Sequence, residues 1–380
     1  MEEIKSKTPQ KPKAEKKGKN KKNKKNSLLP ITVILAVCTM ILLILCAAMA
    51  FFVGTGRSIN DIKKMVELTS EVPSDSEIPM TFTQAEVDEM LSETYVEGQN
   101  DKEGEIKGLI REEAESKGPS FIDILRKLYP ECMVYPGDGT FYFEDVDTTI
   151  PKNPYLKDNF VTEESGFRYY KENDKVKSTL CIDISSHQGA VDWPKVAGAG
   201  VQAVIIRAGY RGYGSGKMVM DEQADGNING ATSNGLKTGV YFFSQAINEE
   251  EIDEEVEALL ELIEPYHITG PVAIDVEKLD AETARTNSLT ADERTALVIH
   301  FCEKVQEAGY TPMIYGNAYS LFHMLNYKEI CKYPIWYAYY SDSLYYYYDL
   351  TMWQYSSNGK VPGVTGNVDL NVLFEEPAEG

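Results

Sequence analysis

The sequence predicts an α/β protein: an irregular TIM-like (β/α) barrel preceded by a transmembrane helix, an acidic stalk and a small α+β accessory region. Three observations lead to this expectation. β-Rich runs alternate with helical patterns beyond residue 180, a long uncharged run lies near the N-terminus, and a polar, acidic segment separates the two. The chain has 380 residues, 43% of them hydrophobic, which is enough for one large core with appendages. We expect five regions, at residues 1–26, 27–54, 55–120, 121–179 and 180–376.

Charge is divided unevenly along the chain. Residues 1–26 contain eleven Lys and three Glu, a surplus of eight positive charges. Because the whole chain has a formal charge of −21, everything after this tail sums to −29. A body this acidic repels polyanions, so the sequence argues against a nucleic-acid partner.

The uncharged run at residues 28–53 is long enough to cross a lipid bilayer as one helix, since a helix of this length spans about 39 Å. Lys residues dominate the preceding flank, whereas Arg57 follows alone, so the N-terminus should stay in the cytoplasm. A cleaved signal peptide is the alternative, but its apolar core usually has about 7–15 residues. The expected location is therefore a plasma membrane, crossed once, with the N-terminus in the cytoplasm and the body of the chain outside.

The next segment, residues 57–120, is polar and acidic. Short helical patterns follow a capping box at Thr83 to Glu86 and recur over 105–117. Neither has enough apolar surface to form a globule alone, so we expect a stalk. Residues 57–180 are also the candidate surface for an envelope or secretion-apparatus protein.

The accessory region shows a helical pattern and then two β-rich runs. Apolar residues occur at helical spacing from Phe121 to Leu128, and the two runs flank Pro136 to Gly139. This arrangement predicts a helix followed by a hairpin.

Eight β-rich runs follow residue 179, with helical patterns between the earlier ones. The clearest helices are expected at 249–266 and 292–308, and the second ends before Gly309, a residue suited to a helix C-cap. Short connections leave little room for helices near the end, so the barrel should be irregular. The expected strands are 180–184, 203–207, 239–243, 271–277, 311–315, 334–338, 352–355 and 368–372.

Acidic residues occupy the strand ends at which a parallel barrel has its mouth. Asp183 and Asp275 end apolar runs, Glu277 follows two residues later, and Asp369 interrupts the last strand. Side chains alternate along a strand, so Asp275 and Glu277 should project from one face, with Cα atoms about 6.6–6.8 Å apart. Carboxyl groups held this close do not all ionise, so at least one pKa should rise and leave a proton donor near neutrality. Cleavage of a glycosidic bond requires such a donor beside a negative charge.

Arg207 and several aromatic residues complete the expected site. Arg207 ends the second strand, either as a substrate ligand or as a counter-charge for the acids. Aromatic side chains supply walls for sugar faces, although in β-rich runs they more often belong to a core. The expected aromatic substrate contacts are Tyr210, Tyr241, Tyr315, Trp336, Tyr337 and Trp353.

Other chemistries lack their motifs. The four His show no metal-hydrolase pattern, the six Cys show no zinc-site spacing, and neither a nucleophile elbow nor a phosphate-binding loop is present. We therefore expect no metal and no cofactor. His187 follows the first strand, where it either lines the mouth or caps a turn.

A set of motifs occurs in a distinctive order beyond residue 180. They are Cys181 to Gly189 with Val191 to Trp193, Ile206 to Tyr210, Gly239 to Phe242, Asp275 to Glu277, Met352 to Ser357 and Val368 to Asn371. Over residues 180–374 this set resembles the glycoside hydrolase family 25 lysozymes, the N-acetylmuramidases of bacteria and phages. Cys181 stands where Gly is expected, and 336–338 is a looser version of a family strand, but neither change removes a carboxyl group.

The resemblance implies an irregular β/α barrel that hydrolyses the β-1,4 bond between N-acetylmuramic acid and N-acetylglucosamine in peptidoglycan. It implies that Glu277 is the general acid and that Asp275 stabilises positive charge, while Asp183 and Asp369 complete the acidic mouth. Whether a carboxylate attacks, activates water or orients the substrate's acetamido group stays open, and we favour the acetamido route. Two alternatives are a non-catalytic protein that binds glycan or scaffolds the envelope, and a glycosidase for another N-acetylated polymer.

Overall fold

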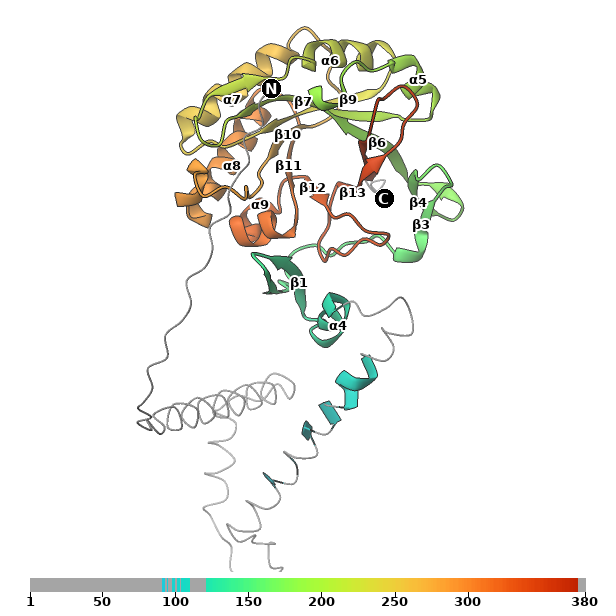
Figure 1. Ribbon diagram of the computed structural model, residues 1–380, viewed down its shortest axis with the longest axis vertical. Helices are drawn as coiled ribbons and strands as arrows, with labels where there is room; N and C mark the ends of the chain where they lie inside the picture. Colours follow the sequence, from blue (N-terminus) through green and yellow to red (C-terminus); the bar gives the residue numbers. More distant parts are fainter. Residues whose placement is uncertain are drawn as a thin grey trace, which may run out of the picture. The chain divides into compact units, whose positions relative to one another are not determined.

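The structure, a computed structural model, describes residues 121–374 and part of the preceding segment (Figure 1). In that segment the described residues are helical; they are 91, 92, 94, 98, 99, 101, 102 and 104–109. The expected cytoplasmic tail, the expected transmembrane helix at 28–53 and most of the expected stalk lie outside the described residues. Within the described ranges, no helix has the length and apolar content needed to cross a bilayer.

A closed ring of eight strands forms the centre of the described chain (Figure 1). Each ring strand coincides with one of the eight expected from the sequence, with ends shifted by a few residues. A short strand that the sequence does not predict, β8 (Met218–Met220), pairs with β7 beside the ring. In order around the ring the strands are β6 (Ser178–Ile184), β7 (Ala203–Arg211), β9 (Lys237–Phe243), β10 (Val272–Asp275), β11 (Pro312–Gly316), β12 (Ile335–Ala338), β13 (Met352–Gly359) and β14 (Val368–Phe374).

The last strand runs against the other seven. From β6 to β13 all ring neighbours pair in parallel, whereas β14 is antiparallel to both β13 and β6. Only residues 360–367 connect β13 to β14. A parallel return requires a crossover of about a dozen residues or more, so a connection this short produces a hairpin. The parallel direction expected of the strands whose ends form the mouth therefore does not hold for β14.

Side chains alternate between the inside of the barrel and the layer of helices around it. The interior cluster consists of Cys181, Ala203, Ile205, Ala273, Met313, Tyr315, Trp336, Met352 and Leu373. The surrounding helices are α5 (Trp193–Gly198), α6 (Ala224–Ser233), α7 (Glu249–Ile263), α8 (Ala291–Glu307) and α9 (Tyr327–Ile330). Helix α8 begins with a reciprocal capping box between Thr290 and Glu293 and is followed by Gly309 at φ 85°, close to the predicted bounds.

The accessory region begins with the predicted helix and hairpin: α4 (Phe121–Leu128), β1 (Cys132–Gly137) and β2 (Thr140–Asp145). Asp138 and Gly139 form the turn with φ of 49° and 72°, the left-handed backbone that Asp-Gly hairpin turns favour. A second sheet of β3 (Phe160–Thr162), β4 (Arg168–Glu172) and β5 (Lys175–Val176) follows.

A tyrosine-rich loop at residues 339–350, between β12 and β13, holds the accessory region against the barrel. The Arg126 guanidinium lies 3.6 Å from the centre of the Tyr345 ring and donates a hydrogen bond to the Tyr339 hydroxyl at 2.9 Å. The Tyr347 hydroxyl donates to the carbonyl oxygen of Pro130 at 2.9 Å. Tyrosine side chains of this loop therefore contact the accessory region directly.

Candidate active site

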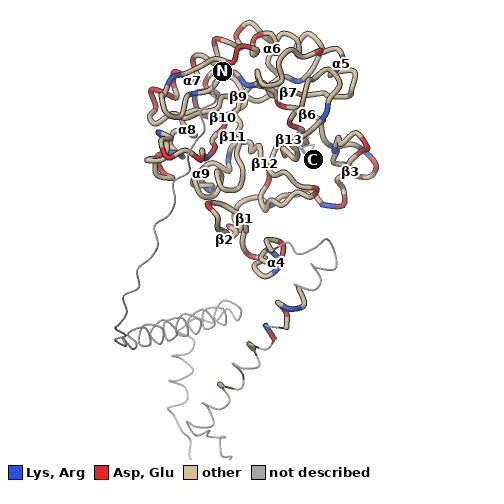
Figure 2. The backbone as a smooth tube through the Cα atoms, in the orientation of Figure 1, with Lys and Arg blue, Asp and Glu red and all other residues tan. Residues whose placement is uncertain are grey.

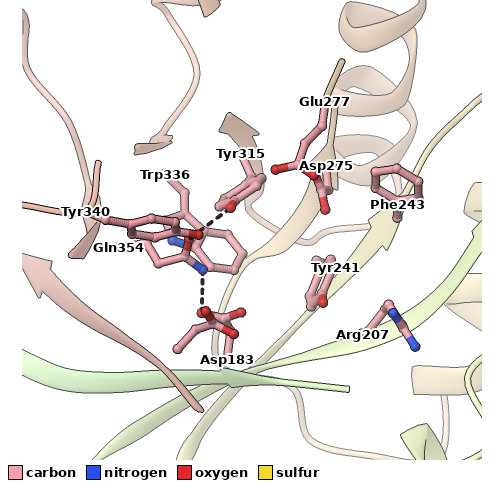
Figure 3. Close-up of a pocket in the computed structure, with 11 residues that line it drawn as sticks. Asp183, Arg207, Tyr241, Phe243, Asp275, Glu277, Tyr315, Trp336, Tyr340 and Gln354 are labelled. Atoms are coloured by element: carbon pink, nitrogen blue, oxygen red, sulfur yellow. Dashed lines mark hydrogen bonds between the residues drawn. The ribbon is translucent and has the colours of Figure 1, made fainter. Parts of the chain in front are cut away.

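A polar pocket of about 340 Å³ opens at the mouth of the barrel (Figure 3). The structure brings together in it all four acidic residues expected at the mouth, Asp183, Asp275, Glu277 and Asp369. The other lining residues are Arg207, Tyr241, Phe243, Tyr315, Trp336, Tyr340 and Gln354.

Asp183 and Asp369 face each other from neighbouring strands. Asp183 lies near the end of β6, and Asp369 is the second residue of β14, directly opposite in the strand register. Because β14 is antiparallel, its beginning reaches the mouth, which corrects the expectation that a strand end carries Asp369 there. Burial raises the pKa of Asp369 to about 6.

Asp183 is buried and accepts two hydrogen bonds on one oxygen. The Nε2 of Gln354 and the Nδ2 of Asn371 each lie 2.8 Å from its Oδ2. The Trp336 indole, which can only donate, fixes the Asn371 amide because its Nε1 lies 2.8 Å from Oδ1 of Asn371. Burial raises the pKa of Asp183 to about 8; Asp369 adds to the rise, and the two amides oppose it. A proton on Asp183 therefore belongs on Oδ1.

Asp275 and Glu277 point into the pocket close to each other (Figure 3). The strand expected at 271–277 ends at Asp275, so Glu277 lies on the segment that follows. Asp275 is buried, and its Oδ1 has no hydrogen-bond partner among the described residues. Burial, followed by the charge of Glu277, holds the pKa of Asp275 well above its usual value. Burial also raises the pKa of Glu277; the nearby Tyr315 hydroxyl opposes this rise, and the charge of Asp369 adds to it.

Arg207 lines the pocket, but its guanidinium is paired with a residue outside it. Nε and Nη2 of Arg207 lie 2.9 Å and 2.8 Å from Oδ2 of Asp221, and Nη2 also donates to the Ser186 hydroxyl at 3.0 Å. Arg207 still lowers the pKa of Asp275 through space. The contact partner of Arg207 is therefore Asp221, and its influence on the acidic cluster acts only at a distance.

Half of the aromatic residues expected to contact substrate line the pocket: Tyr241, Tyr315 and Trp336. Tyr337 and Trp353 are 1% and 0% exposed and belong to the core outside the ring, because each follows an inward-facing residue on its strand. Tyr210 does not line the pocket either, and its ring centre lies 5.5 Å from the Arg207 guanidinium. The structure therefore does not place these three residues in the pocket, and their contact with substrate stays a prediction.

Phe243, Tyr340 and Gln354 also line the pocket, although the motifs in the sequence do not predict them. Gln354 holds an inward position on β13, where its Oε1 accepts hydrogen bonds from the Tyr315 and Tyr340 hydroxyls, both at 2.9 Å. Strict alternation along β13 identifies Gln354 once Met352 is placed inside. Tyr340 lies in a loop, where no periodicity predicts the direction of its side chain.

His187 is exposed in a short turn after β6, where its backbone N–H donates to the Ser185 hydroxyl at 3.3 Å. It does not line the pocket, which favours the turn interpretation. In the described ranges, no group of His, Cys, Asp and Glu is placed to hold a metal ion. Cys132, Cys181, Cys302 and Cys331 are free thiols.

Comparison with known proteins agrees with this geometry. Residues 182–364 match the family model of the glycosyl hydrolases family 25. The barrel belongs to glycoside hydrolase family 25. The matched range includes Asp183, Asp275 and Glu277, and Asp369 lies just beyond it on the last barrel strand.

Relatives of the family 25 barrel include two curated proteins. Over 200 residues the chain is 26% identical to the uncharacterized protein YegX of Escherichia coli K12. This alignment covers 50% of this chain and 68% of YegX. Over 201 residues the chain is 29% identical to the autolytic lysozyme of Clostridium acetobutylicum. This alignment covers 51% of the chain and 55% of that enzyme. Among solved structures, the autolysin LytC of Streptococcus pneumoniae is 25% identical with a TM-score of 0.48, over 63% of this chain and 58% of LytC. The chain thus spans little more than half of the last two proteins.

Proposed function

We propose that the family 25 barrel is a lysozyme that cleaves the β-1,4 bond between N-acetylmuramic acid and N-acetylglucosamine in peptidoglycan. The observation that carries the proposal is the gathering of four carboxyl groups with raised pKa values in one pocket, none of them in an ion pair within the described chain. Family membership and the autolytic lysozyme among the relatives support the same activity.

In the proposed mechanism, Asp275 and Glu277 share one proton because two neighbouring buried carboxyl groups do not ionise together. Without substrate, deeper burial favours the proton on Asp275. An acetamido N–H of the sugar that donates to Asp275 favours the anion there and leaves the proton on Glu277.

Glu277 then donates this proton to the glycosidic oxygen while the C1–O bond breaks. The acetamido oxygen bonds to C1, and anionic Asp275 stabilises the resulting positive charge. Water subsequently opens this intermediate and returns a proton to Glu277. Tyr241, Tyr315 and Trp336 supply walls for the sugar rings.

The test is to incubate the protein with purified peptidoglycan and identify the new reducing ends by mass spectrometry. We expect muramic-acid reducing ends. Glucosamine ends, or cleavage of another N-acetylated polymer in preference, would contradict the proposed bond. Binding of peptidoglycan without any new ends would support the non-catalytic glycan-binding alternative.

We also propose that residues 28–53 anchor the enzyme in the plasma membrane, with the Lys-rich tail in the cytoplasm and the barrel outside. The support is the length of the uncharged run and the charge bias of its flanks. Residues 57–180 then supply the surface for an envelope partner. Membrane fractionation tests the anchor: we expect the chain in the membrane pellet and its barrel open to protease added outside. A soluble chain of reduced mass would indicate a cleaved signal peptide.

A further inference from the structure

A second groove, of about 530 Å³, lies beside the catalytic pocket and shares Glu277 with it. Lys278, Tyr319 and His323 are among the residues that line this groove. The tip of the accessory hairpin β1–β2 contacts two of them, although the hairpin lies outside the family 25 match at residues 182–364.

Asp138, at the turn of the hairpin, joins the two groove residues. The Lys278 ammonium donates to Oδ1 of Asp138, and the Tyr319 hydroxyl donates to Oδ2 at 2.7 Å. The Lys278 ammonium also lies 5.1 Å from the centre of the Tyr319 ring. One carboxylate of the accessory region therefore ties together two segments of the barrel.

The hairpin fits closely at this point. A Cβ atom added at Gly137 would overlap the ring of Tyr319. From the second hairpin strand, the Tyr142 ring packs edge-on against Tyr319, with ring centres 5.6 Å apart. The position of the tip is thus set by packing as well as by charge.

Lys278 directly follows Glu277 on a segment with few other contacts. The backbone N–H of Val276 donates to the Tyr315 carbonyl at 3.4 Å. From 277 to 280 the described chain shows no backbone hydrogen bond to other segments. After the Val276 hydrogen bond, the contact of Lys278 with Asp138 is therefore the next one along the chain that restrains this segment.

We propose that Asp138 is a positioning residue of the active site: by holding Lys278 and Tyr319, the hairpin tip fixes the segment that carries Glu277. Asp138 itself lines neither the pocket nor the groove, so it acts through Lys278. The proposal rests on the proposed function, in which Glu277 is the acid. In this proposal the accessory region helps to position the general acid Glu277.

A second ion pair provides a matched control. The Lys328 ammonium lies 2.7 Å from Oδ2 of Asp147 and also joins the accessory region to the barrel, but neither residue lines the pocket or the groove. Both pairs are at the surface, so Asp138→Asn and Asp147→Asn should change the melting temperature by similarly small amounts. Asn also tolerates the left-handed backbone at position 138.

Hydrogen exchange on the full chain tests the proposal without relying on hydrolysis. We expect the amides of residues 276–284 to exchange several-fold faster in Asp138→Asn than in the wild type or in Asp147→Asn. Equal exchange of this segment in all three proteins would overturn the proposal. A wild type that cuts no peptidoglycan would defeat the proposed function, while the exchange comparison would still decide the role of Asp138.

Kinetics on soluble peptidoglycan fragments then measure the catalytic consequence. We expect Asp138→Asn to lower kcat about tenfold with KM within about twofold, because a misplaced catalytic group slows chemistry more than binding. Asp147→Asn should stay within about twofold of the wild type in both constants. Lys278→Met should lower kcat as much as Asp138→Asn does. The double variant should be no slower than either single variant, since each removes the same contact between Lys278 and Asp138. Additive losses, or equal kcat for the two Asp→Asn variants, would contradict the proposal.

Discussion

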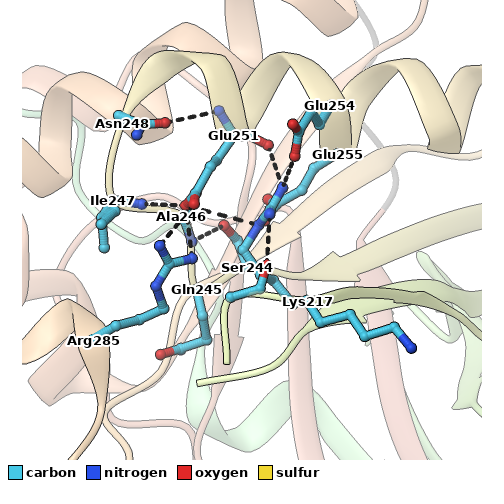
Figure 4. A network of polar contacts seen from close by, with 12 residues as sticks. Lys217, Ser244, Gln245, Ala246, Ile247, Asn248, Glu251, Glu254, Glu255 and Arg285 are labelled. Atoms are coloured by element: carbon cyan, nitrogen blue, oxygen red, sulfur yellow. Dashed lines mark hydrogen bonds and ion pairs between the residues drawn. The ribbon is translucent and has the colours of Figure 1, made fainter. Parts of the chain in front are cut away.

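Two clusters of acidic side chains in this protein, each with at least one buried member, differ in whether a cation accompanies them. In the pocket, no Lys or Arg forms an ion pair with Asp275 or Glu277 within the described chain. On α7, Oε1 of Glu255 lies 2.6 Å from Nε of Arg211, and the Arg211 guanidinium also pairs with Glu254 at 3.0 Å (Figure 4).

The difference shows that burial alone does not make a catalytic site. Burial raises the pKa of Glu255 to about 7, but hydrogen bonds from Ser244 and Arg211 oppose the rise. Within the described chain the pocket acids have no cation in an ion pair with them, although two amides donate to Asp183, and they repel one another. Neutralising a pocket acid therefore relieves repulsion, whereas neutralising Glu255 removes the one fully buried counter-ion of Arg211 and leaves this guanidinium with Glu254, which is exposed, and Glu251, which is 3.9 Å away. The same Glu→Gln change should have opposite consequences in the two clusters.

The largest effect should come from Glu277→Gln. The amide cannot donate the acid proton, so we expect the rate of peptidoglycan hydrolysis to fall about a thousandfold. The free energy of unfolding should stay the same or rise, because one of the mutually repelling carboxyl groups is gone. Reducing-end release and denaturant unfolding, measured on the same preparation, check both halves. Activity equal to that of the wild type would remove Glu277 from the acid role.

Glu255→Gln is the matched change in the paired cluster. We expect it to lower the free energy of unfolding by about 3 kcal/mol, since breaking a buried ion pair strands the other partner. Hydrolysis per folded molecule should stay near the wild-type value, because Glu255 does not line the pocket. Urea unfolding with an activity assay at low temperature measures the two quantities. A loss of activity without a loss of stability would contradict the contrast between the clusters.

The pH dependence of stability should reveal the proton held by Asp183. Its pKa is raised to about 8 from an ordinary value near 4, so the folded protein binds the proton more tightly than the unfolded chain does. The stabilisation of the folded state by this proton is fully present below about pH 4. It is lost as the pH rises through about 8, at up to about 1.4 kcal/mol of unfolding free energy per pH unit. Asp183→Asn keeps an oxygen that accepts from both amides but does not titrate. Unfolding curves from pH 5 to pH 9 should therefore fall more steeply for the wild type than for this variant; parallel curves would argue against a raised pKa.

A smaller effect should follow from the acidic surface, which includes the acidic residues along α7 (Figure 2). Anionic peptidoglycan and an acidic enzyme repel each other, and salt screens this repulsion over about 30 Å at 0.01 M but only about 8 Å at 0.15 M. We expect KM for intact peptidoglycan to fall about two- to threefold over this range of added salt. A rising KM would indicate a local cationic contact with the substrate.

The sequence was sufficient to predict the strands and the acids because both rest on local patterns. Runs of β-branched and aromatic residues mark all eight ring strands, and polar residues at their ends mark the mouth. The direction of β14 depends on a connection length that the pattern does not encode. Asp369 reaches the pocket because β14 is antiparallel and its beginning lies at the mouth. The sequence therefore predicts the position of Asp369 correctly but the direction of its strand wrongly.

The aromatic contacts were harder to predict because a shift of one residue along a strand reverses the face. Trp336 lies inside the barrel and Tyr337 outside, and on β13 the outward Trp353 precedes the inward Gln354. Asp138 carries no catalytic motif, and its link to Lys278 spans the accessory region and the barrel. Long-range contacts of this kind follow from tertiary packing alone.

The protonation of the pocket is tested most directly by a carbon-13 NMR titration of the side-chain carboxyl groups, with each signal assigned by its loss in one variant. We predict that the signal lost in Asp183→Asn titrates near pH 8 and that the signal lost in Glu277→Gln titrates above the usual range of glutamate. If the signals of all four pocket carboxyl groups, those lost in Asp275→Asn and Asp369→Asn included, show ionisation below about pH 4.5, as ordinary exposed acids do, no pocket acid holds a proton at neutral pH and the proposed catalysis fails.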